Sequence, residues 1–228
     1  MYGLDALDET EVHPVLARAF EEAGFGVMRE QAYPTQWKRK RRAGDQLPLP
    51  RDRERCDLVL TPRPGQRLRD SLAAAKTAKR TRDEVAGTLF EAMGGAGGEV
   101  LSARDEVAPD DAYWLELKVV AQYSVESGVP GPNRVYASQI TRFAAGDIGK
   151  LSCDRTIVHG GLALVLFTAD RRTAVHDAGV MVERLVERGL RVGEPTSRST
   201  PIVERIGNAV CTVVLIPLRP APPIDEDE

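Results

Sequence analysis

Apolar and polar positions follow two rhythms along the chain, and these rhythms predict helices and strands in turn. Residues 9–23 carry apolar side chains three and four positions apart, as one buried face of a helix requires. That face is expected to hold Val12, Val15, Leu16, Ala19, Phe20 and Ala23. A similar pattern predicts a helix over 171–189 that buries Val175, Val180, Val182, Leu185 and Val186. Further helices are expected over the charged segment 66–93 and from Arg134 onward.

Short apolar runs between turn-forming residues predict the strands. They cover 25–33, 55–61, 112–123 and 160–168, with a terminal hairpin of 201–206 and 209–217 turning at Gly207-Asn208. Loops are expected at 46–51, 94–98 and 127–133, where Gly and Pro are concentrated. The order of these elements predicts a single α/β domain over 1–228, in which helices flank both faces of a mixed β-sheet.

Charged residues interrupt two of the predicted strands. Asp57 lies within the apolar run 55–61, and Glu116 and Lys118 lie within the run 112–123. Trp114, Val119 and Val120 surround the second pair, which argues against a solvent-exposed strand. Burying a charge costs several kcal/mol unless a partner compensates it. Two carboxylates and an amine in core strands therefore indicate a binding site.

The spacing of these residues suggests what the site binds. Residues two apart in a strand point to the same face, so Glu116 and Lys118 are neighbours. If the strand with Asp57 lies alongside, a Mg²⁺ or Mn²⁺ ion between the two carboxylates removes their repulsion. The backbone carbonyl of Leu117 is a further candidate ligand. Water bound to such an ion is a usable nucleophile, and Lys118 can neutralise charge on a phosphate oxygen.

Charge is distributed unevenly over the 228 residues, although the net charge is only −3. The segment from Lys38 to Arg82 holds 15 Lys or Arg against 5 Asp or Glu, whereas the chain ends in an acidic tail at 224–228. The basic run Lys38, Arg39, Lys40, Arg41, Arg42 is a candidate nucleic-acid-binding surface. A solvated loop and a charged helix face explain it equally well.

The cellular setting is inferred from what the sequence lacks. No apolar run approaches the roughly 20 residues that cross a bilayer, and the N-terminus does not resemble an export signal. The three cysteines, Cys56, Cys153 and Cys211, match no metal or redox spacing. A cytoplasmic protein without a membrane partner is expected.

The arrangement of Asp57, Glu116 and Lys118 resembles the PD-(D/E)xK, or restriction-endonuclease-like, nuclease superfamily. The resemblance covers roughly 9–168, with an inserted charged helix at 66–93, and leaves the helix and hairpin of 171–217 outside. It departs from the superfamily pattern at Cys56, where many members have proline, and in the 58 residues between Asp57 and Glu116. It implies a restriction-endonuclease-like core with Asp57, Glu116 and Lys118 as catalytic residues and Mg²⁺ or Mn²⁺ as cofactor.

Several other residues are candidates for the same site. Members of the superfamily often carry an acidic residue on the first helix, where Glu11 and Glu22 lie; a charged helix flank is the favoured interpretation of both. Gln139 is interpreted as either a site residue or a surface amide, and Asp147 as a helix cap. The three histidines, His13, His159 and His176, show no metal spacing and are interpreted as structural or surface residues.

The leading hypothesis is a Mg²⁺-dependent nuclease that hydrolyses phosphodiester bonds, with DNA as the favoured substrate. Cutting both strands requires two sites and hence suggests a homodimer. The first alternative is a catalytically inactive module with the nuclease fold that binds nucleic acid or a partner subunit. The second is an interaction protein that adds the edge of its terminal hairpin to a partner sheet.

Overall fold

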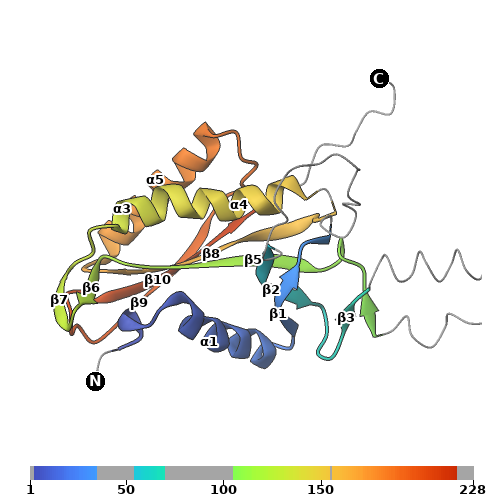
Figure 1. Ribbon diagram of the computed structural model, residues 1–228, viewed down its shortest axis with the longest axis horizontal. Coiled ribbons are helices and arrows are strands. Elements are labelled where there is room, and N and C mark those ends of the chain that lie inside the picture. The colour runs from blue at the N-terminus through green and yellow to red at the C-terminus, as the bar shows by residue number, and fades with distance from the viewer. Residues whose placement is uncertain (1–2, 35–53, 70–104, 155, 220–228) are drawn as a thin grey trace, which may run out of the picture.

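A six-stranded mixed sheet forms the centre of the computed structural model, which describes residues 3–34, 54–69, 105–154 and 156–219 (Figure 1). Across the sheet the strands are β1 (Gly26–Ala32), β2 (Arg55–Thr61), β5 (Tyr113–Ala121), β8 (His159–Thr168), β10 (Val210–Pro217) and β9 (Thr196–Pro201). Strands β5 and β8 run parallel, and all other neighbours are antiparallel. The expected mixed sheet of an α/β protein is therefore confirmed.

Helices cover both faces of this sheet, as expected. The short helix η1 (Leu4–Ala6) leads into α1 (Glu9–Glu22), which lies against one face (Figure 1). The other face carries a continuous helical stretch made of α3 (Tyr136–Ser138), the π-helical segment η4 (Gln139–Phe143) and α4 (Ala144–Cys153), together with α5 (Arg171–Glu187). Asp8 and Glu11 form a capping box that fixes the first turn of α1.

Strand β8 contributes to the cores on both sides. Leu162, Leu164 and Leu166 pack with α4 and α5, whereas Ala163, Val165 and Phe167 pack on the side of α1. This alternation explains why the sequence of β8 is apolar without interruption. A third cluster surrounds Trp114 at the end of the sheet near β1 and β2. The central strands are thus buried from both sides.

Two predicted helix faces are rotated in the structure. Helix α1 buries Val12, His13 and Ala17, while Val15 is 49% exposed. The prediction for α5 was also wrong in part, because Val175 and Val186 are exposed; the buried face holds Ala174, Ala178, Met181 and Leu185. Apolar residues occur around much of both helices, so spacing alone permits several faces. Small alanine side chains let the helices approach the sheet closely, and packing selects those faces.

Two segments differ from the predicted elements. Arg67–Leu68 form strand β3, which pairs with β4 (Glu106–Val107), where the start of a helix was expected. The expected loop at 127–133 contains a small hairpin of β6 (Tyr123–Glu126) and β7 (Val129–Pro132). Ser127 and Gly128 have the positive φ angles of a tight hairpin turn.

The terminal hairpin is present but displaced along the chain. Its first strand is 196–201 rather than 201–206, and Val210 lies opposite Pro201. Ile202 donates its N–H to Ala209, so residues 202–209 form the connection. Asn208 is buried there because it bonds the backbone of Tyr123 and the carboxylate of Asp5. These bonds, which no local pattern reveals, tie the connection to η1 and to the start of β6.

Some predictions fall on residues outside the described part of the chain. They are the basic run 38–42, the loop at 46–51, the helix beyond residue 69, the glycine-rich loop at 94–98 and the acidic tail. Among the helices that the structure does describe, none has the length and apolar character required to cross a bilayer.

Candidate active site

The candidate site lies where β2 stops pairing with β5. Only Leu58, Val59 and Leu60 of β2 pair with β5, opposite residues 113–115. Strand β5 continues beside β8 as far as Ala121, which leaves residues 116–119 without β2 along their other edge. We call this stretch the open edge of β5. Its backbone N–H groups need partners other than a neighbouring strand.

Carboxylates occupy the open edge in place of a strand. Asp57 Oδ2 accepts a hydrogen bond of 2.7 Å from the N–H of Leu117, and Glu9 Oε2 accepts one of 3.3 Å from Val119. Asp57 comes from β2 and Glu9 from the first turn of α1. The N–H and C=O of one strand residue point to the same side, so the carbonyl of Leu117 also faces this edge.

Glu116 lies beside Asp57, as the sequence predicted. The register of β2 and β5 places Leu58 opposite Leu115, and the next pair in line is Asp57 and Glu116. Glu116 is only 3% exposed, and its carboxyl shares a hydrogen bond with Asp57. Tyr33 donates a second hydrogen bond to Glu116 Oε1 and stacks its ring on Trp114. The expected proximity of the two carboxylates is therefore confirmed.

Burial raises the pKa values of both carboxyl groups, so the pair retains a proton. Desolvation, followed by the negative charge of Asp57, raises the pKa of Glu116 to about 9, although the hydrogen bond from Tyr33 opposes the shift. Desolvation also raises the pKa of Asp57, and the N–H of Leu117 partly offsets it. At neutral pH the Glu116 carboxyl therefore carries the proton that it shares with Asp57.

Lys118 connects the two helical layers through the open edge. Its Nζ lies 2.8 Å from Glu9 Oε2 on α1 and 3.6 Å from Asp147 Oδ2 on α4, and its side chain is 18% exposed. Burial would lower the pKa of Lys118, but the hydrogen bond and charge of Glu9, with Asp147, raise it. Lys118 therefore remains an ammonium group that is held inside the site.

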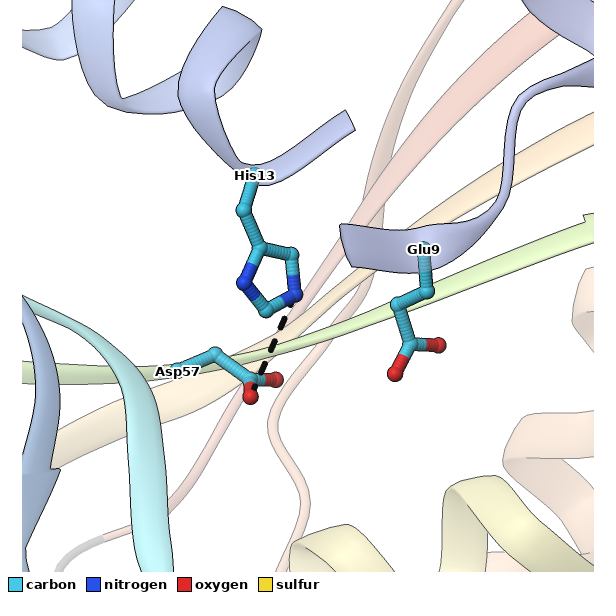
Figure 2. Close-up of side chains that lie close together, drawn as sticks. All are labelled: Glu9, His13 and Asp57. Carbon is cyan, nitrogen blue, oxygen red and sulfur yellow. Dashed lines mark ion pairs between the residues drawn. The ribbon is translucent and has the colours of Figure 1, made fainter. Parts of the chain in front are cut away.

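Glu9, His13 and Asp57 form a second grouping around the same edge. Figure 2 shows Glu9 and His13 projecting from α1 toward the Asp57 side chain of β2. One potential ligand atom of each residue lies within 4.8 Å of the others. His13 is buried, contrary to a surface position, and its Nε2 lies 4.0 Å from Asp57 Oδ1. Helix α1 therefore contributes more to this site than the sequence indicated.

Negative charge exceeds positive charge among the described groups around the open edge. Glu9, Asp57 and Asp147 are set against the ammonium groups of Lys118 and Lys150, the latter 2.9 Å from Asp147, while Glu116 holds its proton. Oxygen donors from two partly dehydrated carboxylates, with the Leu117 carbonyl nearby, are the ligands that Mg²⁺ and Mn²⁺ use. The residues present therefore fit a divalent cation, which would replace the shared proton.

The remaining candidate residues have different partners. Glu11 completes the capping box of α1, and Glu22 pairs with Arg18 on the exposed side of the helix. Gln139 accepts a hydrogen bond from Asn133. Asp147 is not a helix cap, because η4 continues directly into α4 ahead of it. His159 and His176 are exposed, as a surface interpretation allows.

Sequence reasoning missed Glu9 and Tyr33 and assigned no site role to His13. Glu9 and His13 are four residues apart and so share one face of α1, a spacing that was available as a signal. Tyr33 offers no such signal, because it follows β1 and reaches a residue 83 positions away. No protein-family model, curated protein or solved structure matches the chain.

Proposed function

We propose that this protein is a metal-dependent nuclease with a restriction-endonuclease-like core that hydrolyses phosphodiester bonds, with DNA as its favoured substrate. The observation that carries the proposal is the meeting of Asp57, Glu116 and Lys118 at the open edge of β5. The sequence alone points to these three residues by their chemistry, and 58 residues separate the first two. Their convergence in one partly dehydrated site supports a shared chemical role.

Each residue has a distinct part in this proposal. Asp57, Glu116 and the carbonyl of Leu117 would hold Mg²⁺ or Mn²⁺, which when bound supplies an acidified water and charge compensation for phosphate. Lys118 keeps its proton and presents positive charge to a phosphate oxygen. Glu9 and Asp147 position that ammonium group from opposite sides. Tyr33 orients Glu116 through its hydrogen bond.

Substrate binding is assigned to the basic run. Lys38, Arg39, Lys40, Arg41 and Arg42 would contact phosphates without reading base sequence, so binding should weaken as salt concentration rises. A homodimer would bring together the two sites that double-strand cleavage needs. Size measurement by analytical ultracentrifugation, with and without duplex DNA, tests that part of the proposal separately.

Cleavage of supercoiled plasmid and of labelled oligonucleotides in Mg²⁺ or Mn²⁺ tests the activity. We expect Asp57→Asn, Glu116→Gln and Lys118→Met to reduce the cleavage rate by about a hundredfold or more, since the first two remove ligands of the metal ion and the third removes the ammonium group that faces the phosphate. Glu187→Gln is the matched control, because Glu187 is exposed and pairs only with Arg184 among the described residues.

Two results would count against the nuclease. If all three variants cut as fast as the wild type, another part of the chain or a contaminant carries the activity. If the wild type binds DNA in a salt-dependent manner but cuts nothing with either ion, the inactive nucleic-acid-binding module becomes the better assignment.

A further inference from the structure

His13 is a buried histidine whose inner ring nitrogen lacks a hydrogen-bond partner. The residue is 3% exposed, and within the described part of the chain nothing forms a hydrogen bond with its Nε2. An unsatisfied polar atom in a protein interior costs about 1–3 kcal/mol, so its presence calls for an explanation. Asp57 Oδ1 lies 4.0 Å from this nitrogen, which is too far for a hydrogen bond.

The side chains around Nε2 are held in position by other contacts. Glu9 is one helical turn before His13 on α1, and the two project toward Asp57 (Figure 2). Lys118 and the N–H of Val119 both bond Oε2 of Glu9, and the N–H of Leu117 bonds Oδ2 of Asp57. The three side chains therefore form a largely preorganised group in which one ligand atom of each lies within 4.8 Å of the others.

The outer nitrogen of the imidazole faces a different carboxylate. His13 Nδ1 lies 3.9 Å from Glu30 Oε1. Glu30 lies on β1 across from Asp57, because the residues on either side of it pair with the residues on either side of Asp57. Its φ of +53° is in the left-handed region that non-glycine residues rarely occupy. A carboxylate near the second nitrogen of a metal-binding histidine favours the tautomer whose other nitrogen is free to bind metal.

We propose that Glu9, His13 and Asp57 bind a first-row transition-metal ion, in addition to the Mg²⁺-type site of Asp57 and Glu116. Mg²⁺ and Ca²⁺ select oxygen ligands, whereas an imidazole nitrogen with two carboxylates suits ions from Mn²⁺ to Zn²⁺. Asp57 belongs to both groups and would link them. The inference shares this residue with the proposed nuclease but concerns metal binding, which can be measured without any nucleic acid.

Electron spin-echo spectroscopy of Mn²⁺ bound to the full-length, chelator-treated protein tests the proposal. We expect the ¹⁴N modulation of a coordinated imidazole in the wild type and its loss in His13→Gln. Calorimetric titration should show that this change weakens Mn²⁺ binding about tenfold or more. Loss of a residue that merely hydrogen-bonds a metal ligand already lowers metal affinity by about that factor. Mg²⁺ affinity should stay within about twofold, since Mg²⁺ has little use for imidazole. His176→Gln is the matched control, because His176 is exposed beside Asp177.

The alternative is that His13 and Asp57 are only a structural pair. In that case the wild type gives no ¹⁴N modulation, or His13→Gln binds Mn²⁺ as tightly as the wild type, and either result overturns the proposal. The wild-type spectrum alone decides the question if His13→Gln fails to fold. Imidazole-bound Mn²⁺ without DNA cleavage would retain this site and remove the nuclease. Cleavage without the nitrogen signal would do the reverse.

Discussion

The two edges of β5 are paired very differently. Toward β8, nine consecutive residue pairs from Tyr113–His159 to Ala121–Phe167 form an unbroken parallel ladder. Toward β2, only three pairs form before the strands separate. The partners on the β8 side are apolar and buried beyond His159, whereas those on the open edge are carboxylates from α1 and β2.

This difference shows how one strand can serve both stability and chemistry. A backbone N–H that is not used by a neighbouring strand still needs an acceptor, and a buried carboxylate equally needs donors. At the open edge, Leu117 and Val119 satisfy Asp57 and Glu9 in this way. Charge is thus tolerated where the ladder ends, while the continuous ladder beside β8 holds the strand in place.

The largest loss of stability is expected from a substitution on the β8 side of β5. Leu164 is fully buried between β5, β10 and the helices of one face, so Leu164→Ala should lower the free energy of unfolding by about 2–5 kcal/mol. Urea unfolding in the presence of a chelator measures it. Leu215→Ala is the control on the neighbouring strand, because Leu215 is 37% exposed and should cost less. Equal losses of unfolding free energy in the two variants would contradict the deeper burial of Leu164.

The open edge should instead make stability depend on pH. Folding raises the pKa of Glu116 from 4.5 to about 9, so the folded state retains a proton that the unfolded chain has lost. The free energy of unfolding of the metal-free protein should therefore fall as pH rises through this interval, by at most about 1.4 kcal/mol per pH unit from this group. Asp57, whose pKa is also raised, adds a contribution of the same sign.

Glu116→Gln should flatten this dependence, because the amide does not titrate. Urea unfolding with a chelator at pH 6, 7 and 8 provides the measurement. Glu187→Gln should keep the wild-type slope, since Glu187 lies on the exposed side of α5. A wild-type protein that becomes more stable as pH rises over this range would contradict the arrangement of buried carboxylates.

The sequence predicted the central strands of the sheet, because these strands follow regular patterns of apolar residues. The apolar runs located β2, β5 and β8, and charge within two of them singled out Asp57 and Glu116, which were expected to meet if those two strands lie side by side. Continuous apolar runs carry this information because the sequence of each central strand reflects its own burial from both sides. The mixed sheet with helices on both faces followed from the order of the elements.

The residues that the sequence did not reveal reach the site from elsewhere in the fold. Glu9 belongs to the first turn of α1, where acidic residues are common for capping alone. His13 was placed off the buried face because the apolar pattern of α1 permits more than one orientation. Tyr33 reaches Glu116 only through the packing of its ring on Trp114. Such contacts depend on tertiary packing, which a single sequence pattern does not encode.

The smallest expected effect is the difference in stability between two tyrosine variants. Each variant removes a buried hydroxyl group, one at each edge of β5. Tyr33 donates to Glu116 at the open edge, whereas Tyr113 Oη, close to Gly161 of β8, has no hydrogen-bond partner among the described residues. Tyr33→Phe should lower the free energy of unfolding by about 1 kcal/mol, because the ring still stacks on Trp114 but the Glu116 carboxyl loses a donor. Tyr113→Phe should be neutral or slightly stabilising, since it removes an unsatisfied polar atom.

Tyr33→Phe should also raise the pKa of Glu116 further and so weaken Mg²⁺ binding near neutral pH, which calorimetric titration would detect. If the two variants were indistinguishable in both urea unfolding and titration, the hydroxyl of Tyr33 would have no more influence on Glu116 than the hydroxyl on the β8 side, and its positioning role would be wrong.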